Sequence, residues 1–380
     1  IPPPTMSNND VGRLRTVLIG SVGEGWQSQD MDENSWGRAY CRKMASPSGD
    51  YEFMHSLPIY DFYKRVEGAR SELRAVKDYL KRDGINVLAI DEPQLAKVTP
   101  QPGIYPGSEC LPFNAANVRD PFIMLGKTLV VSRSTRTGTT HIPDWYMPLL
   151  RDFCGKQGLR VLESPAVPPH LQLAKPGLWE DPDEMHRYIH TDGNGYNGRI
   201  YEAFQQEDPI FEPADMFRTD GRRVFCMESM VSNGVYHEWF RREFPEVEFV
   251  PFRRYFYSEV DVPMHSDASY VTLDSHTIMM APEQMPDPET IRKVQERYRI
   301  LIPPRSDLPN PTSRRYHLNT LSLDEKRMLV NAKEKTMIKW LESYGYKPIP
   351  MEICNMNFCG GGFHCTSLDL ERDDIAAPPA

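Results

Sequence analysis

The chain has 380 residues, of which 40% are hydrophobic, so it is long enough for one large domain or two ordinary ones with a sizeable core. Its formal net charge of -9 argues against nucleic acid or an anionic membrane as the main partner, because phosphate groups are bound by basic surfaces. Seven irregularly spaced cysteines do not form a disulfide framework and favour a reducing compartment. No apolar run approaches the roughly 18 residues of a membrane span, and the opening Ile-Pro-Pro-Pro lacks the regions of a signal peptide. We therefore expect a protein of a reducing, cytoplasmic compartment; its acidic charge suits a cationic small substrate, although most acidic proteins are simply soluble.

The first strong element along the chain is an amphipathic helix at residues 62–83. Its apolar positions step by three and four residues, and Gly84 ends it. These positions are Phe62, Val66, Ala69, Leu73, Val76 and Leu80. Strands are expected on either side of this helix, at residues 16–20 and 85–90.

After this helix, an order of strand, strand, helix, strand recurs four times. The paired strands are predicted at 121–125 with 128–132, 215–218 with 223–227, 269–273 with 277–281, and 318–323 with 327–330. The helices are predicted near 148–157, 236–244, from Asp287-Pro288-Glu289 to about Tyr298, and 333–344. The last strands of these units are predicted at 159–163, 247–251, 300–302 and 349–353.

A fifth unit would be closed by both ends of the chain, since a strand at 365–370 can join the elements between residues 16 and 90. Five ββαβ units predict a single α/β domain over residues 1–380, built as a closed, pseudo-fivefold ring or five-bladed α/β propeller. An ordinary open α/β sheet is the alternative. Two long segments, about 31–58 and 165–208, do not fit the repeat and are expected to be loops that act as lids or are disordered; the aromatic residues of the second favour an ordered lid.

Residues with useful chemistry recur at matching positions, at or just before the first strand of each unit. They are Arg119 and Asp120, Glu212 and Asp215, His265 and Asp267, Thr312 and Ser313, and finally Cys365. In a ring these loops would meet at one end of the axis, as the parts of an active site usually do. Taken singly, each has a plainer reading as a turn residue, a solvated loop residue or, for Cys365, a buried thiol.

The segment Gly360-Gly361-Gly362-Phe363-His364-Cys365 is the most distinctive in the chain. We expect it to present an exposed thiol at the start of a strand, as a cysteine nucleophile requires. Strand alternation would send His364 and Cys365 to opposite faces, and the spacing of Cys359, His364 and Cys365 is not that of a zinc site. The glycine run lacks the Lys-Ser/Thr of a phosphate loop. The sequence thus predicts neither a metal nor a nucleotide cofactor.

These motifs give the chain a resemblance to the amidinotransferases, which belong with the arginine deiminases to the guanidino-modifying pentein superfamily. The similarity runs from about Arg13 to Leu370 and rests on the glycine-rich motif, on Leu323-Asp324-Glu325-Lys326-Arg327, and on Met264-His265-Ser266-Asp267-Ala268. The family fold is the five-bladed α/β propeller. Because family members are often dimers, a homodimer is an open expectation.

The resemblance implies a role for each matching residue. Cys365 would be the nucleophile, His265 the acid and base, and Glu212 a catalytic acid; the implied substrate-binding residues are Arg119, Asp120, Asp215, Met264, Asp267, Gln284, Thr312 and Ser313. Two positions depart from the family. Glu212 replaces the family's aspartate, and deiminases also have Glu here. Gln284 stands where a family arginine grips the α-carboxylate of the donor; either Arg253 or Arg254 takes over this task, or the substrate lacks that carboxylate.

We therefore expect transfer of an amidino group from a guanidino donor, with L-arginine as the first candidate, to an amine, through a covalent adduct on Cys365 and with ping-pong kinetics. A role in specialised-metabolite biosynthesis is part of this expectation. Two alternatives remain. Water could attack the adduct, as in an arginine deiminase or dihydrolase, or the chain could be a binding propeller without catalysis, which retention of Cys365, His265, Asp120 and an acid at 212 argues against.

Overall fold

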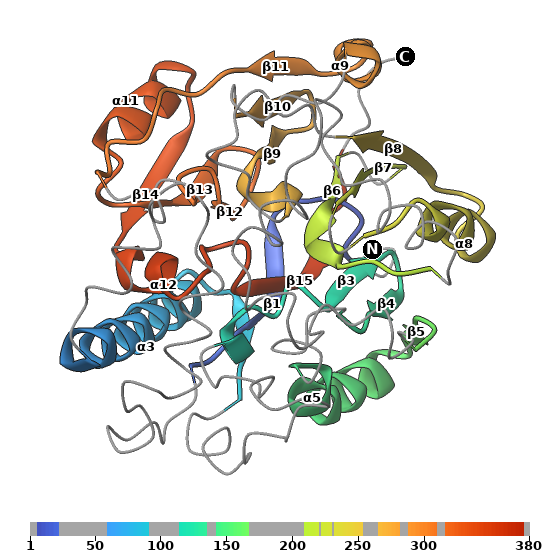
Figure 1. Cartoon of the computed structure of the whole chain (residues 1–380), viewed down its shortest axis with the longest axis horizontal. Helices are drawn as coiled ribbons and strands as arrows, with labels where there is room; N and C mark the ends of the chain where they lie inside the picture. Colours follow the sequence, from blue (N-terminus) through green and yellow to red (C-terminus); the bar gives the residue numbers. More distant parts are fainter. Residues whose placement is uncertain are drawn as a thin grey trace, which may run out of the picture.

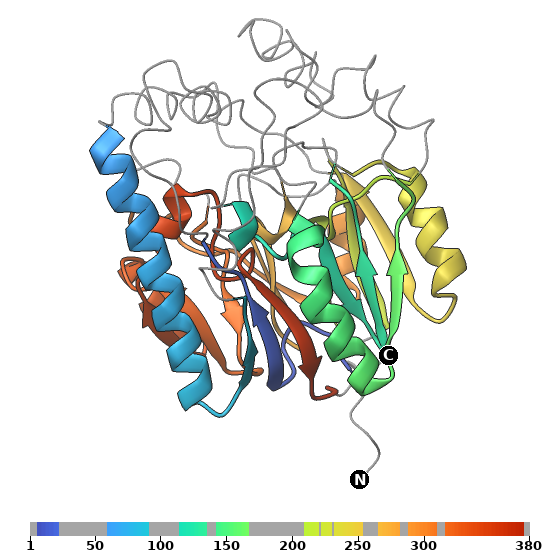
Figure 2. The ribbon, with the colours of Figure 1, turned by 90° about the horizontal axis from the view of Figure 1, so that it is seen from below.

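The computed structural model of the chain describes residues 6–22, 59–90, 114–134, 142–166, 209–219, 222–229, 232–253, 265–281, 288–309 and 316–375. Over these ranges the chain is an α/β protein whose helices lie outside the strands, as Figures 1 and 2 show. The two expected long loops lie almost wholly outside the described residues. None of the helices found in these ranges has the length and apolar character needed to cross a membrane.

The described strands form five separate three-stranded sheets, and all five share one plan. In each, the middle strand pairs antiparallel with one neighbour and parallel with the other. The sheets are β15-β1-β2 (Ser367–Arg372, Leu14–Ile19, Asn86–Leu88), β3-β4-β5 (Phe122–Leu125, Thr128–Val131, Arg160–Glu163), β6-β7-β8 (Met216–Arg218, Arg223–Glu228, Glu248–Arg253), β9-β10-β11 (Tyr270–Asp274, Thr277–Met280, Arg299–Leu301) and β12-β13-β14 (Leu321–Ser322, Arg327–Asn331, Lys347–Met351).

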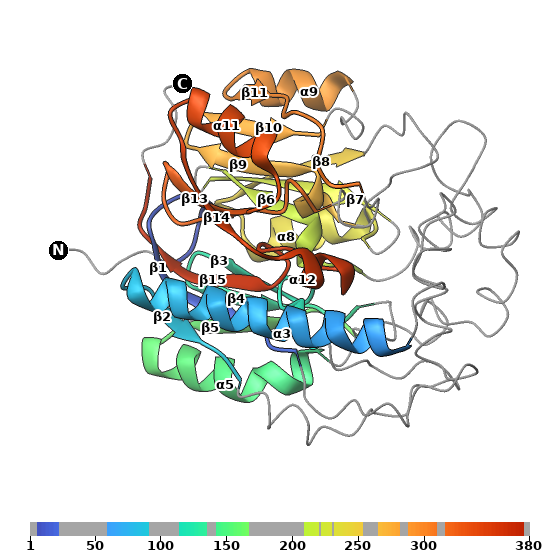
Figure 3. The ribbon, with the colours of Figure 1, turned by 90° about the vertical axis from the view of Figure 1, so that its left-hand side faces the viewer.

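In the described ranges, one helix lies between the two parallel strands of every sheet, so each of the five predicted ββαβ units is present. These helices are α3 (Ile59–Arg82), α5 (Ile142–Gln157), α8 (Val235–Glu243), α9 (Pro288–Gln295) and α11 (Lys335–Ser343). A sixth, short helix, α12 (Cys354–Phe358), packs against α3 just before the glycine run. Figure 3 shows α3 lying along the outside of β1 and β15. Its predicted stripe from Val66 to Leu80 is buried, which confirms the periodicity argument.

Five hydrophobic clusters join each sheet to the next one along the chain. Sheets β3-β4-β5 and β6-β7-β8 share the cluster around Ile123, Val130 and Phe211. The sheet β15-β1-β2, built from both ends of the chain, shares one cluster with β12-β13-β14 and another with β3-β4-β5. The remaining two clusters join β6-β7-β8 to β9-β10-β11, and β9-β10-β11 to β12-β13-β14. In Figure 1 the sheets follow one another around the middle of the molecule. Among the described residues, no named strand of one sheet is paired by backbone hydrogen bonds with a strand of the next, so the sheets do not form one continuous closed sheet.

Many element boundaries differ from the sequence prediction by a residue or more, and four of these differences are informative. Helix α5 begins at Ile142 instead of near Pro148. Burial of Ile142, Tyr146 and Leu150 stabilises the helix and offsets the backbone hydrogen bond that Pro148 cannot donate. Helix α9 ends at Gln295, before the predicted Tyr298. Strand β12 is reduced to Leu321–Ser322. Strand β15 begins at Ser367, two residues after Cys365, and this shift changes the backbone geometry around the predicted nucleophile.

Candidate active site

Short 3₁₀ turns carry the predicted acids and histidine to the entrance of their sheets. Pro213–Asp215 (η4) follows Glu212 and leads into β6, and Ser266–Ala268 (η5) follows His265 and leads into β9. In each, an extended residue precedes a turn that contains a buried aspartate. The two turns are therefore equivalent structures in neighbouring units, as the matching sequence positions predicted.

His265 lies between two buried carboxylates. Its Nε2 is 2.6 Å from Glu212 Oε2, and its Nδ1 is 3.7 Å from Asp120 Oδ1. Glu212 is held by the hydroxyl of Ser134, which donates to Oε1, and its backbone N–H donates to Ser232 Oγ at 3.0 Å. An imidazole placed in this way can hold a proton against a fixed carboxylate and exchange it with a bound molecule.

Asp120, Glu212 and His265 are also the described residues that come nearest to a metal-ligand arrangement, with ligand atoms within 4.8 Å of one another. The short contact between His265 Nε2 and Glu212 Oε2 is that of a hydrogen-bonded pair, which uses the atoms that a metal would need. We therefore interpret the group as a proton-transfer arrangement.

Asp215 binds protein groups through both of its oxygens. Oδ2 accepts hydrogen bonds from the hydroxyls of Ser229 and Ser232, both at 2.6 Å, and Oδ1 accepts the backbone N–H of Ser266 at 3.2 Å. Ser266 lies next to His265, so Asp215 ties the Glu212 turn to the His265 turn. These contacts favour a structural role for Asp215 over the predicted contact with substrate.

Cys365 lies in a turn before β15, and its side chain is 3% exposed. The expectation of an exposed thiol is wrong, because the turn folds the sulfur inward onto Asp267. The thiol donates to Asp267 Oδ2 at 3.3 Å, and the amide Nδ2 of Asn319 donates to Sγ at 3.1 Å. The carbonyl of Cys365 accepts the backbone N–H of Arg119 at 3.0 Å, which links the nucleophile to the Asp120 loop.

Burial, with the negative charges of Asp267 and Asp120, raises the pKa of Cys365 well above its ordinary value. A hydrogen bond from the backbone N–H of Gly362 works in the opposite direction. The thiol is therefore neutral when no cation lies between it and the carboxylates.

His364 reaches the same carboxylate oxygen as Cys365. Its Nδ1 is 2.9 Å from Asp267 Oδ2, so the prediction that the two residues face opposite ways is wrong. The physical reason is that residues 363–366 form turns, and strand alternation begins only at Ser367. Burial alone would raise the pKa of Asp267, but the hydrogen bond and positive charge of His364 outweigh it and keep this pKa below its usual value. Asp267 is thus a carboxylate anion.

The second oxygen of Asp267 is also buried, and Oδ1 has no hydrogen-bond partner among the described residues. Buried carboxylate oxygens without a partner are rare and costly in folded proteins. The site therefore contains, beside the thiol, a negatively charged hydrogen-bond acceptor, and none of the described residues donates to it.

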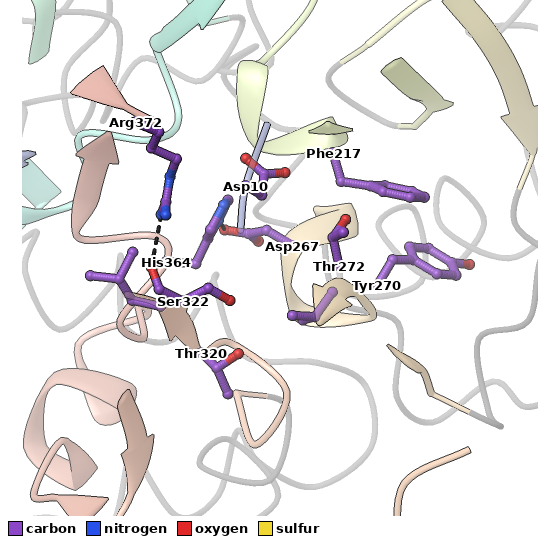
Figure 4. A pocket seen from close by; sticks show the side chains of 11 residues that line it. Asp10, Phe217, Asp267, Tyr270, Thr272, Thr320, Ser322, His364 and Arg372 are labelled. Atoms are coloured by element: carbon purple, nitrogen blue, oxygen red, sulfur yellow. Dashed lines mark hydrogen bonds and ion pairs between the residues drawn. The ribbon is translucent and has the colours of Figure 1, made fainter. Parts of the chain in front are cut away.

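Behind Asp267 and His364, a cavity of about 20 Å³ extends toward Arg372 and Asp10 (Figure 4), enough room for a single water molecule. Cys365 does not line it, so we do not take it as the substrate pocket. Beyond it lies a buried charge cluster in which Asp369 binds Arg119, Arg218 and Arg372.

Arg119 belongs to this cluster. Its Nη2 donates to Asp369 Oδ1, and its Nε donates to the carbonyl of Ser367 at 3.0 Å. The guanidinium is committed to β15, so its contacts do not support the predicted contact with substrate. They position the loop that carries Asp120.

The structure brings together Cys365, His265, Glu212, Asp120 and Asp267 from four different units. Met264, Gln284, Thr312 and Ser313 lie outside the described residues, as does Arg254. Sequence reasoning missed Asn319 and the inward position of His364. The His364 contact was hidden by the assumption that the strand begins at Cys365. Asn319 carried no signal of its own, since it fell inside the strand predicted at 318–323, whereas the observed strand begins at Leu321.

No family model matches the chain. A segment of 173 residues, 43% of this chain, is 31% identical to glycine amidinotransferase, mitochondrial, of Danio rerio, and spans 39% of that protein. The corresponding protein of Xenopus tropicalis is 24% identical over 328 residues, which cover 83% of this chain and 71% of the relative. The segment most similar to the zebrafish relative thus spans less than half of that relative's length.

Among solved structures, SxtG, an amidinotransferase from Microseira wollei, matches with a TM-score of 0.71 at 22% identity, covering 100% of this chain and 99% of that one. DDAH from Pseudomonas aeruginosa matches with a TM-score of 0.55 at 12% identity, over 94% of this chain and 99% of that one. These are likenesses of fold. With the sequence matches, they relate this chain to the amidinotransferases, a family of enzymes that transfer amidino groups, within the wider fold shared with DDAH.

Proposed function

We propose that this protein transfers an amidino group from a guanidino donor to an amine through a covalent intermediate on Cys365. One observation carries this proposal. The thiol lies against an ionised carboxylate, Asp267, whose other buried oxygen has no partner among the described residues. A planar cation with several N–H donors is the ligand that such a group accepts. The amidinotransferase relatives favour a guanidinium.

Binding sets up the reaction. Asp267 and Asp120 would accept N–H groups of the guanidinium, which places its central carbon near Cys365 Sγ. The bound cation offsets the negative charge that keeps the thiol neutral, so the thiol gives up its proton, which passes to His265, and the thiolate forms beside its target. The same carboxylates thereby bind the donor and delay activation of the nucleophile until the donor is present.

The first half-reaction forms a carbon–sulfur bond. The thiolate adds to the guanidinium carbon and gives a tetrahedral intermediate, and the bond from this carbon to the alkyl-substituted nitrogen then breaks. His265, held by Glu212, gives that nitrogen the proton it needs to leave as an amine. With L-arginine as donor the released amine is L-ornithine, and Cys365 retains a cationic amidino group as a thioester-like adduct.

In the second half-reaction an acceptor amine enters the space left by the first product. Its nitrogen attacks the amidino carbon and gives up a proton to His265, and the carbon–sulfur bond breaks to return the thiolate. Because the first product leaves before the acceptor enters, the kinetics are ping-pong.

Hydrolysis is the alternative for the same residues. If water attacks the adduct, the products are those of a deiminase or dihydrolase, and the fold likeness to DDAH is compatible with this. Transfer is favoured because the sequence relatives carry amidinotransferase names, and because SxtG matches the fold with a higher TM-score than DDAH.

The remaining parts of the proposal concern architecture and setting. We propose that the five units form one five-bladed α/β propeller, supported by the five hydrophobic clusters that join neighbouring units in cyclic order. In this ring Arg119 and Asp215 position the loops of the site. The likeness to SxtG, an enzyme of saxitoxin biosynthesis, is compatible with a role in specialised metabolism. A cytoplasmic homodimer is the proposed state of the protein.

The test follows label from guanidino-labelled arginine by mass spectrometry, with and without a panel of amines. Label that passes to an added amine, with release of ornithine, supports transfer. Citrulline or urea formed regardless of the amine would refute it. Intact-mass measurement should show the amidino adduct on the wild type but not on Cys365→Ala. Cys359→Ala is the matched control, because it removes another buried thiol from the same segment and should keep the adduct.

A further inference from the structure

Asn319 holds the segment that carries the nucleophile. Its Oδ1 accepts the backbone N–H groups of His364 at 2.8 Å and Cys365 at 3.1 Å, and its backbone carbonyl accepts the N–H of Phe363 at 3.1 Å. The side chain is 1% exposed. Three consecutive residues, ending at the nucleophile, are thus fixed by one asparagine from the loop before β12.

The chemistry of these contacts fixes the orientation of the amide. Backbone N–H groups can only donate, so the oxygen of Asn319 must face His364 and Cys365. The NH₂ group then faces the opposite way, toward two acceptors. It lies 3.1 Å from Cys365 Sγ and 3.1 Å from the carbonyl oxygen of Asp267. The donor therefore points at the reacting sulfur.

We infer that Asn319 takes part in the proposed transfer reaction, by donating a side-chain hydrogen bond that stabilises the Cys365 thiolate and aims it at the guanidinium carbon. This inference rests on the proposed function. A hydrogen bond to a charged acceptor is about twice as strong as one to a neutral acceptor, so the amide stabilises the thiolate more than the thiol. It opposes the effects of burial and of Asp267 and Asp120, the carboxylates that face this sulfur.

The glycines of the motif fit this role. A Cβ on Gly362 would lie 2.5 Å from Asn319 Oδ1 and 2.7 Å from its Cβ, closer than such atoms can approach. Gly362 thus lets the asparagine reach the sulfur. Gly361 packs in the same way on Asn117, whose Oδ1 would lie 2.2 Å from the added Cβ, but no contact joins Asn117 to the sulfur. Asn117 is therefore a matched control.

The experiment measures the thiolate of Cys365 directly and needs no substrate. Thiolate ultraviolet absorbance is recorded against pH as the difference between each protein and the same protein carrying Cys365→Ser. Asn319→Asp keeps the oxygen that accepts the two backbone N–H groups but replaces the donor with a second oxygen. We expect its Cys365 pKa to rise by about one unit or more, equivalent to about tenfold less thiolate at a given pH. Asn117→Ala should leave the value unchanged.

The outcomes separate the two proposals. A folded Asn319→Asp with an unchanged Cys365 titration would refute the inference, whatever the enzyme does with arginine. A pKa raised both in Asn319→Asp and in Asn319→Ser, which adds no charge, supports it even if the reaction proves to be hydrolysis. Circular dichroism checks the fold of each variant. If Asn319→Asp does not fold, Asn319→Ser, which loses the amide donor without adding charge, should show the same upward direction, and no change there would equally overturn the inference.

Discussion

Asp267→Asn should reduce catalysis and yet make the nucleophile more reactive toward an alkylating reagent. Asparagine keeps the size of the side chain and an oxygen that can accept the His364 hydrogen bond. It removes the negative charge that, after burial, is the main cause of the raised pKa of Cys365. It also removes one anionic partner of the guanidinium. The two roles of Asp267 should therefore change in opposite directions.

The size of the effect follows from the 3.3 Å between Cys365 Sγ and Asp267 Oδ2. With an effective dielectric constant of about 20, two unit negative charges at this distance repel by about 5 kcal/mol, or about 4 pKa units, as an upper limit. We expect the pKa of Cys365 to fall by at least about one unit. A lower pKa also reduces intrinsic nucleophilicity, so the net gain in alkylation rate is about threefold per unit at mildly alkaline pH.

The assay is iodoacetamide alkylation followed by peptide-resolved mass spectrometry. Cys154 is the internal reference, because burial in helix α5 raises its pKa to about 11 and it lies outside the site. Amidino transfer is measured in parallel, and we expect kcat/KM to fall by about 100-fold or more, as on loss of a preorganised charged contact. Unchanged or slower alkylation in a folded Asp267→Asn protein would show that the carboxylate does not control the thiol.

Three further predictions concern other parts of the molecule. Asp369→Asn leaves three buried guanidinium groups without their shared anion and should lower the free energy of unfolding, measured in urea, by about 3–5 kcal/mol. The arginines outweigh the effect of burial and hold the pKa of Asp369 well below its unfolded value. The difference in unfolding free energy between wild type and variant should therefore be full above a pH of about 4 and shrink as the pH falls further. Gly362→Ala forces Cβ against Asn319 and should destabilise by about 1–3 kcal/mol in thermal unfolding, whereas Gly155→Ala, with open space around its Cβ, should be neutral or stabilising. Glu212→Gln should lower kcat by about 100-fold or more and flatten its pH profile, while Glu212→Asp should retain much more activity; equal loss in both would contradict a charge-based role.

Most of the fold could be predicted because its signals are local. The stripe from Val66 to Leu80 defines α3 by helical spacing, and Gly126, at a φ of 57°, closes the hairpin of β3 and β4 where the turn residues predicted it. The start of α5 was missed because a proline usually marks the beginning of a helix. Here Pro148 lies inside the helix, which forms despite the backbone hydrogen bond that Pro148 cannot donate. Tertiary packing around Tyr146 decided that boundary, and a single sequence does not display packing.

The site was predictable only as far as position along the repeat determines position in space. Asp120, Glu212, His265 and Asp267 precede first strands, and the structure brings them together. Asn319 could not be found in this way, because its role depends on where the side chain of a turn residue points. Starting β15 two residues too early was enough to place His364 on the wrong side, because residues 363–366 form turns, where strand alternation does not apply.

The charges around the sulfur explain why burial of the nucleophile is useful. Asp267 and Asp120 oppose the thiolate, whereas Asn319 and the Gly362 backbone favour it, so small additions of positive charge decide its state. A neutral molecule that enters the site adds none, and the thiol stays protonated and weakly reactive. A guanidinium adds a full charge within contact distance of both carboxylates. Under the proposed mechanism the site would therefore select its donor twice, once by binding it and once by becoming nucleophilic only in its presence.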